Sequence, residues 1–160
     1  MAGDGTPVTS KGINLTKLLK GEDHGKRVPL TSNATKLIIV SGCYVLGAKS
    51  AKYFHTTFPK ATILGFGGSA TKKKGVFYER FLDRLPEGLD VDSEADMKTI
   101  VETWRKFIED ANGNAALWKG GWPDPTLRKP GYMLPDGKIV VWSKRDKKWV
   151  ERTIGDGIDI

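Results

Sequence analysis

The chain has 160 residues, of which 39% are hydrophobic and 28% charged, and its formal net charge is +7. This balance is typical of one folded domain and is too apolar for a disordered chain. No apolar run approaches the roughly 18 residues of a membrane span, and the first residues lack the apolar core of a secretory signal. One cysteine excludes an internal disulfide framework, which favours a cytoplasmic location.

The first half of the chain predicts a strand, a helix and a second strand. Residues 1–12 form a flexible arm rich in Gly, Thr and Ser, and 13–20 have the apolar spacing of a short helix. The continuous apolar run at 36–40 predicts a buried strand, after which the period becomes helical over 45–58. A second apolar strand follows at 61–66, so we expect a right-handed βαβ unit.

The second half of the chain predicts two further helices and, near the C-terminus, antiparallel strands. The longer helix begins at Ser93, which can cap it with Asp96 three residues on, and Trp104 lies on its apolar stripe. Trp142 and Trp149 flank a charged turn and are expected to pair across a hairpin. The predicted elements are helices at 76–85 and 93–111 and strands at 131–135, 138–142 and 148–154. We therefore predict a single α/β domain over 1–160, with a small parallel βαβ core and a C-terminal antiparallel hairpin.

The one cysteine, Cys43, follows the first predicted strand and precedes a helix. Reactive groups collect at the carboxyl ends of parallel strands, and a helix N-terminus lowers the pKa of a nearby thiol. Gly42 permits a close backbone turn, and the amide of Cys43 or Tyr44 is a candidate oxyanion donor. The alternative is that Cys43 only fills space in the core, as many cysteines do.

A nucleophilic cysteine normally needs a base, and the chain has two histidines. His55 lies twelve residues after Cys43 within a predicted helix, about 18 Å along its axis, which is too far. His24 lies in a polar loop before Gly25, so a dyad within this chain pairs His24 with Cys43. The alternative is a solvent-exposed loop histidine with no catalytic role.

The segments "DHG", "KLIIVSGCYVLGAKSAKYF" and "ATILGF", over about residues 23–69, resemble the second half of a caspase-like cysteine peptidase domain. The resemblance implies Cys43 as nucleophile, His24 as base, and backbone amides around Gly25 and Gly42 as the oxyanion site. It also implies a peptide or protein substrate, no cofactor, and a bacterial effector or toxin as the parent protein, delivered without an export signal. A second possibility within the resemblance is that the histidine comes from a larger upstream chain.

The loop after the second strand offers a different chemistry. Gly65, Gly67 and Ala70 match a G-x-G-x-x-A pattern, whose backbone amides can cradle a phosphate beside a lysine run. The candidate phosphate or substrate loop comprises Gly65, Gly67, Gly68, Ser69, Lys72, Lys73 and Lys74. Its alternative is a plain surface loop, whereas in a peptidase the same loop would flank the substrate pocket.

Three functions therefore remain open from the sequence, and the third is an enzyme that acts on a phosphate ligand or a nucleic acid through the loop at 65–74. The first is a caspase-like cysteine peptidase or thiol hydrolase. The second is a non-catalytic basic module that binds an anionic partner, a phosphate or a nucleic acid, with Cys43 buried in the core. Two histidines and one cysteine at unrelated positions predict no metal site.

Overall fold

A computed structural model of the chain describes residues 33–40, 42–68, 74–113, 129–143 and 145–154. These residues form a five-stranded sheet with the strand order β1-β2-β3-β4-β5. The strands are β1 (Leu37–Ile39), β2 (Thr62–Phe66), β3 (Pro130–Met133), β4 (Lys138–Ser143) and β5 (Lys148–Thr153). The helices are α2 (Ala48–Thr57), α3 (Lys74–Leu82) and α4 (Glu94–Gly113). The predicted arm and the helix at 13–20 lie outside the described residues.

The predicted α/β fold is confirmed, including its parallel core and its antiparallel end. Strands β1 and β2 pair in parallel, with Leu37 opposite Thr62, and α2 connects them. The other three pairings are antiparallel. Trp142 lies opposite Trp149 in the β4–β5 hairpin, with ring centroids 5.3 Å apart, as their positions in the sequence predicted.

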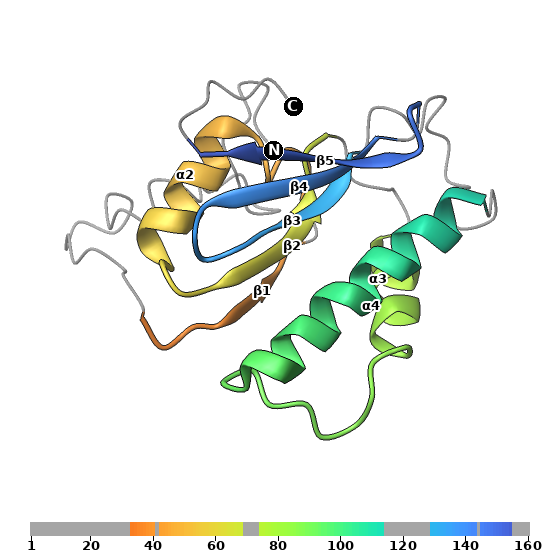
Figure 1. Ribbon diagram of the computed structural model, residues 1–160, viewed down its shortest axis with the longest axis horizontal. Helices are drawn as coiled ribbons and strands as arrows, with labels where there is room; N and C mark the ends of the chain where they lie inside the picture. Colours follow the sequence, from red (N-terminus) through yellow and green to blue (C-terminus); the bar gives the residue numbers. More distant parts are fainter. Residues whose placement is uncertain (1–32, 41, 69–73, 114–128, 144, 155–160) are drawn as a thin grey trace.

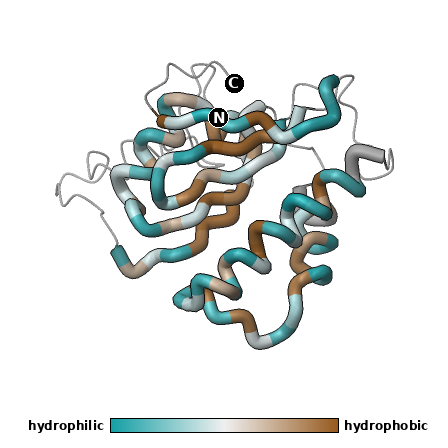
Figure 2. The backbone as a smooth tube through the Cα atoms, in the orientation of Figure 1, coloured by the Kyte–Doolittle hydropathy of each residue, from teal (hydrophilic) through white to brown (hydrophobic). Residues whose placement is uncertain are grey.

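Helices cover both faces of the sheet. Figure 1 shows α2 on one side and the α3–α4 pair on the other, and Figure 2 shows the apolar residues along the strands between them. Every residue of β2 is buried, because this strand packs against helices on both faces. This explains why its sequence is a continuous apolar run rather than an alternation.

Two apolar clusters result, one on each face. The aromatic core lies on the α3–α4 face and comprises Leu64, Phe66, Phe77, Tyr78, Phe81, Ile100, Trp104, Phe107, Ile108, Tyr132, Val140 and Trp142. The aliphatic core lies on the α2 face and comprises Val45, Leu46, Ala51, Phe54, Ile63, Met133, Ile139 and Val141. Trp104 is fully buried, as its place on the apolar stripe predicted, and its Nε1–H donates to the carbonyl of Gly131 at 2.8 Å.

The start of α4 agrees with the predicted cap. The N–H of Asp96 donates to Ser93 Oγ at 3.3 Å, and the N–H of Met97 donates to the carbonyl of Ser93 at 2.9 Å. The Asp96 carboxylate accepts the N–H of Asp90 at 2.9 Å, which anchors the preceding loop instead of closing a reciprocal capping box.

The start of α2 differs from the sequence prediction. The helix begins at Ala48 rather than at Val45. The N–H groups of Tyr44 and Leu46 donate to the carbonyls of Gly68 and Phe66, so this segment stays beside β2 before the helix starts. Val45 and Leu46 are buried by this long-range pairing, which a local apolar period does not reveal.

Candidate functional site

Cys43 lies beyond the carboxyl end of β1, at the edge where the sequence analysis placed it. Its side chain is half-buried and packs against the aromatic core. The N-cap of α2 is Gly47, so Cys43 precedes the first helical residue by a full turn of chain. The helix dipole acts mainly within the first turn, and the role of Cys43 as a nucleophile stays a prediction.

Tyr78 of α3 is the titratable neighbour of Cys43 that the structure identifies. Its hydroxyl donates to the carbonyl of Val40 at 2.7 Å, next to the cysteine-bearing turn. Burial, and then the negative charge of the Cys43 thiolate, raise the pKa of Tyr78 well above its usual range. The phenol therefore stays neutral at physiological pH and acts as a fixed hydrogen-bond donor that ties α3 to β1.

The proposed oxyanion donors fall partly outside the described residues. Gly42 is half-buried, and a Cβ atom added to it would lie 3.2 Å from Val45 Cγ2. The N–H of Tyr44 donates to the carbonyl of Gly68 at 2.8 Å, so it is not available to a substrate oxyanion. Gly25 and the candidate base His24 lie outside the described residues, and their roles stay predictions.

His55 lies at the other end of the sheet from Cys43. A Cβ atom added to Gly137, in the turn between β3 and β4, would lie 3.9 Å from His55 Nε2. That turn follows Met133, which pairs with Ile63 near the amino end of β2. This position agrees with the sequence argument that His55 is not the partner of Cys43.

The first residues of the glycine-lysine loop form backbone hydrogen bonds within or beside the sheet. Gly65 belongs to β2, opposite Gly131 of β3. The N–H of Gly67 donates to the carbonyl of Lys129 at 2.7 Å, which removes one of the amides expected to cradle a phosphate. Gly68 is buried and accepts the N–H of Tyr44 through its carbonyl.

The lysine part of this loop is only partly described. Lys74 is the first residue of α3, whereas Ser69, Lys72 and Lys73 lie outside the described residues. The sequence pattern predicted this helix from residue 76, and it begins two residues earlier, at Lys74. The phosphate-binding role of the loop stays a prediction.

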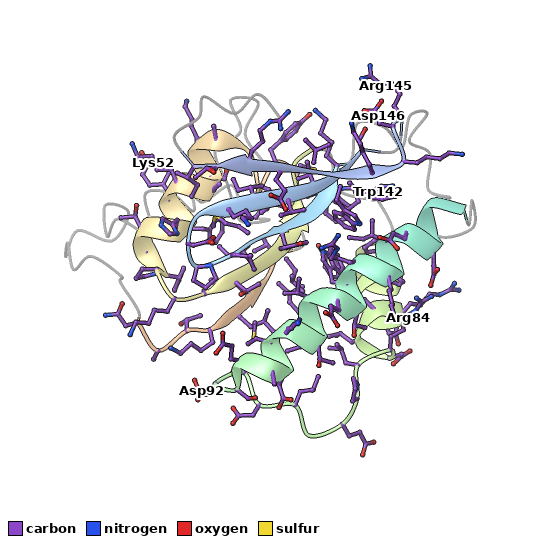
Figure 3. The ribbon with its side chains drawn as sticks, in the orientation of Figure 1. Lys52, Arg84, Asp92, Trp142, Arg145 and Asp146 are labelled. Atoms are coloured by element: carbon purple, nitrogen blue, oxygen red, sulfur yellow. The ribbon has the colours of Figure 1, made fainter. Side chains whose placement is uncertain are left out.

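The structure contains a cleft that the sequence analysis did not identify. We call it the α4 cleft. It has a volume of about 1000 Å³ and lies between the first turns of α4 and the amino ends of β1 and β2. Its lining comprises Lys36, Lys60, Thr62, Val91, Asp92, Glu94, Ala95, Met97, Lys98, Val101, Tyr132, Leu134, Pro135 and Asp136. Figure 3 shows Asp92 projecting at the end of α4 where the cleft opens.

The α4 cleft lies beside the first turns of α4, whereas the large rings of this helix lie farther along it. Trp104 and Phe107 are buried among the rings of α3, with centroids 4.9 Å apart for Phe81 and Trp104. The cleft-lining residues Ala95 and Lys98 at the start of α4 are exposed. Met97 and Val101 also line the cleft, and both pack against the aromatic core while staying partly exposed. In the sequence, the part of α4 beside the cleft is marked only by the apolar stripe that begins at Met97.

The charges around the cleft are balanced in number. Three lysines and three acids line it, namely Lys36, Lys60, Lys98, Asp92, Glu94 and Asp136. The described residues contain no cluster of three or more His, Cys, Asp or Glu side chains that could hold a metal ion. In the same part of the chain, no helix combines the length and apolarity needed to cross a membrane.

Comparison of the chain with protein-family models, with curated proteins and with solved structures gave no match.

Proposed function

We propose that this domain is a binding module and that its ligand, a segment of another polypeptide, occupies the α4 cleft. The observation that carries the proposal is the cleft itself, an opening of about 1000 Å³ beside an otherwise closely packed aromatic core. Ligand sites are typically concave and apolar, with a few polar groups at the rim. The α4 cleft has this composition.

The chemistry of the lining favours a polypeptide over a phosphate. Met97, Val101 and Leu134 offer apolar contact, and Val91 is 39% exposed at the opening. A phosphate site needs converging cations or backbone amides, whereas this lining contains as many acids as lysines. Mixed charges around an apolar floor suit a segment that carries apolar and charged side chains together. In this proposal Cys43 is a core residue of the aromatic side.

The proposal is tested by selecting ligands and then blocking the cleft. Phage-displayed random dodecapeptides are selected on the immobilised domain, and the recovered peptides are synthesised and titrated. Ala95→Trp fills the cleft from α4, and Lys106→Trp places the same side chain at an exposed α4 position that does not line it. We expect Ala95→Trp to weaken binding at least tenfold and Lys106→Trp to leave it unchanged. Failure to enrich any peptide, or equal binding by both variants, contradicts the proposal.

We propose the thiol hydrolase as a second function. What supports it is the half-exposed Cys43 at the carboxyl edge of a parallel strand pair, together with the resemblance to caspase-like peptidases. In this role the domain would act on peptide or protein substrates in a reducing compartment, as an effector. His24, or a histidine from an upstream chain, would be the base.

This second proposal predicts a reactive thiol. The rate of iodoacetamide alkylation at Cys43 is measured against pH in the native domain and in His24→Ala. We expect Cys43 to be alkylated in the native domain and the alkylation rate to fall in the variant. Alkylation only upon unfolding would show that Cys43 is a core residue and would leave the binding module as the function.

A further inference from the structure

The outer edge of β1 presents backbone groups with a defined direction. The N–H of Val40 donates to the carbonyl of Leu64, and the carbonyl of Lys36 accepts the N–H of Thr62. Residues alternate in direction along a strand, so the backbone groups of Leu37 and Ile39 point away from β2. Strand β1 is the first strand of the sheet, and no strand among the described residues lies on that side.

The two edge strands of the sheet differ in their side chains. On β5, the exposed residues are Lys148, Glu151, Arg152 and Thr153, so charged groups line that edge. Such charges are a common means of preventing further strand pairing. Strand β1 contains only Leu37, Ile38 and Ile39, all of them partly buried. It therefore has the composition of an interior strand at an edge position.

Both faces of β1 carry apolar surface that the described residues cover only in part. Leu37 and Ile39 pack against the aromatic core, and Ile38 and Val40 pack against the aliphatic core. A strand placed beside β1 would extend both cores at once. An extended backbone is the one ligand that satisfies the outward N–H and C=O groups and buries apolar surface on both faces.

We infer that β1 accepts an extended polypeptide segment as a sixth strand, which leads into the α4 cleft at Lys36. The inference rests on the proposed binding function and names how the ligand is held. The segment has apolar side chains on both of its faces, because both cores meet it. At the end beside Lys36 and Lys60 it carries an acidic residue, since these two lysines lie at the amino ends of β1 and β2.

The test removes one outward N–H and keeps the rest of the sheet. Ile39→Pro deletes the outward amide, and proline is tolerated on an edge strand where its nitrogen faces away from the ladder. Ile39→Ala is the matched control, because it loses the same side chain and keeps the N–H. With the dodecapeptides selected above, we expect Ile39→Pro to lose at least tenfold more affinity than Ile39→Ala.

A second experiment measures the protection of the backbone amides of β1. Amide hydrogen exchange is followed at Leu37 and Ile39 of the wild-type domain with and without the selected peptide. We expect binding to slow exchange at both amides and to leave the exposed β5 residue Glu151 unchanged. Peptides from which acidic residues are removed should bind more weakly, and Lys36→Gln should abolish that difference.

The outcomes separate this inference from the proposed function. Suppose that Ala95→Trp weakens peptide binding but that Ile39→Pro and Ile39→Ala bind the peptide equally well. This result would support the binding module and overturn the sixth strand. If the Leu37 amide is protected from hydrogen exchange without peptide, and this protection increases with protein concentration, a second copy of the chain occupies the β1 edge. That result would also overturn the inference. If no peptide is selected, both the proposed function and the inference fail.

Discussion

The two faces of the sheet are closed by different means. The aliphatic core is covered by α2, a single helix of ten residues, and its members are mainly aliphatic side chains. The aromatic core is covered by two helices, α3 and α4, and its members are mainly rings. Strand β2 contributes to both, through Ile63 on one face and Leu64 on the other.

The difference explains where the cleft lies. The rings around Trp104 come from α3 and α4, and their centroids lie 4.9 to 6.1 Å from that of Trp104. Where the rings end, near Val101 of α4, the remaining side chains do not fill the space, and the α4 cleft opens. On the α2 face the side chains are mainly branched and aliphatic. A core of large rigid groups thus gives strong packing at one end and an unfilled site at the other.

The largest expected effect is the loss of Trp104. Trp104→Ala should lower the free energy of unfolding by about 3 to 5 kcal/mol from cavity formation alone. It also removes the donor to the carbonyl of Gly131, which adds about 1 to 3 kcal/mol if that group stays buried. Urea denaturation measures the change, and Trp104→Phe, which keeps a ring without the N–H, should recover part of it. A loss below 2 kcal/mol would contradict the central role of this ring.

A smaller effect is expected on the aliphatic face. Leu46 is fully buried, and Leu46→Ala should cost about 2 to 5 kcal/mol by cavity formation, with no side-chain hydrogen bond involved. The same urea denaturation compares it with Trp104→Ala. The exposed Lys52→Ala of α2 is the control and should change stability by no more than about 0.5 kcal/mol. If Leu46→Ala proved the more damaging of the two core variants, the ranking of the two faces would be wrong.

The smallest effect is expected at Tyr78, where the aromatic core meets the cysteine turn. Tyr78→Phe removes the hydroxyl that donates to the Val40 carbonyl, and it should cost about 1 to 2 kcal/mol at neutral pH. The raised pKa of Tyr78 also adds a pH dependence. Because the unfolded tyrosine ionises near pH 10 while the buried one does not, the wild-type domain loses stability as pH rises above about 10.

The pH dependence of stability should differ between the wild type and Tyr78→Phe. The free energy of unfolding is measured from pH 8 to about 11 in the wild type and in Tyr78→Phe. We expect the difference between them to shrink above about pH 10, because the variant lacks the ionising phenol. A constant difference would show that Tyr78 does not titrate on unfolding in the way that its burial indicates.

Much of the fold was predictable because its signals are local. The apolar runs predicted β1 and β2, the helical period and Ser93 predicted α4, and the positions of Trp142 and Trp149 predicted their pairing. Each of these features depends on residues near one another in the chain. Cys43 was likewise placed at the carboxyl end of β1 by its position after an apolar run.

The tertiary structure decided the features that depend on distant residues. The N–H groups of Tyr44 and Gly67 are taken by carbonyls far along the chain or on another strand, which no local pattern records. The α4 cleft is lined by residues from α4, from the ends of three strands and from the loops between them, which are far apart in the chain. The position of β1 at the edge of the sheet, among the residues that the structure describes, depends on which strands pair with it. The sequence by itself determined the elements and their buried faces, because periodicity is a local property. The spaces and edges between elements were decided only when the side chains of all of them had packed together.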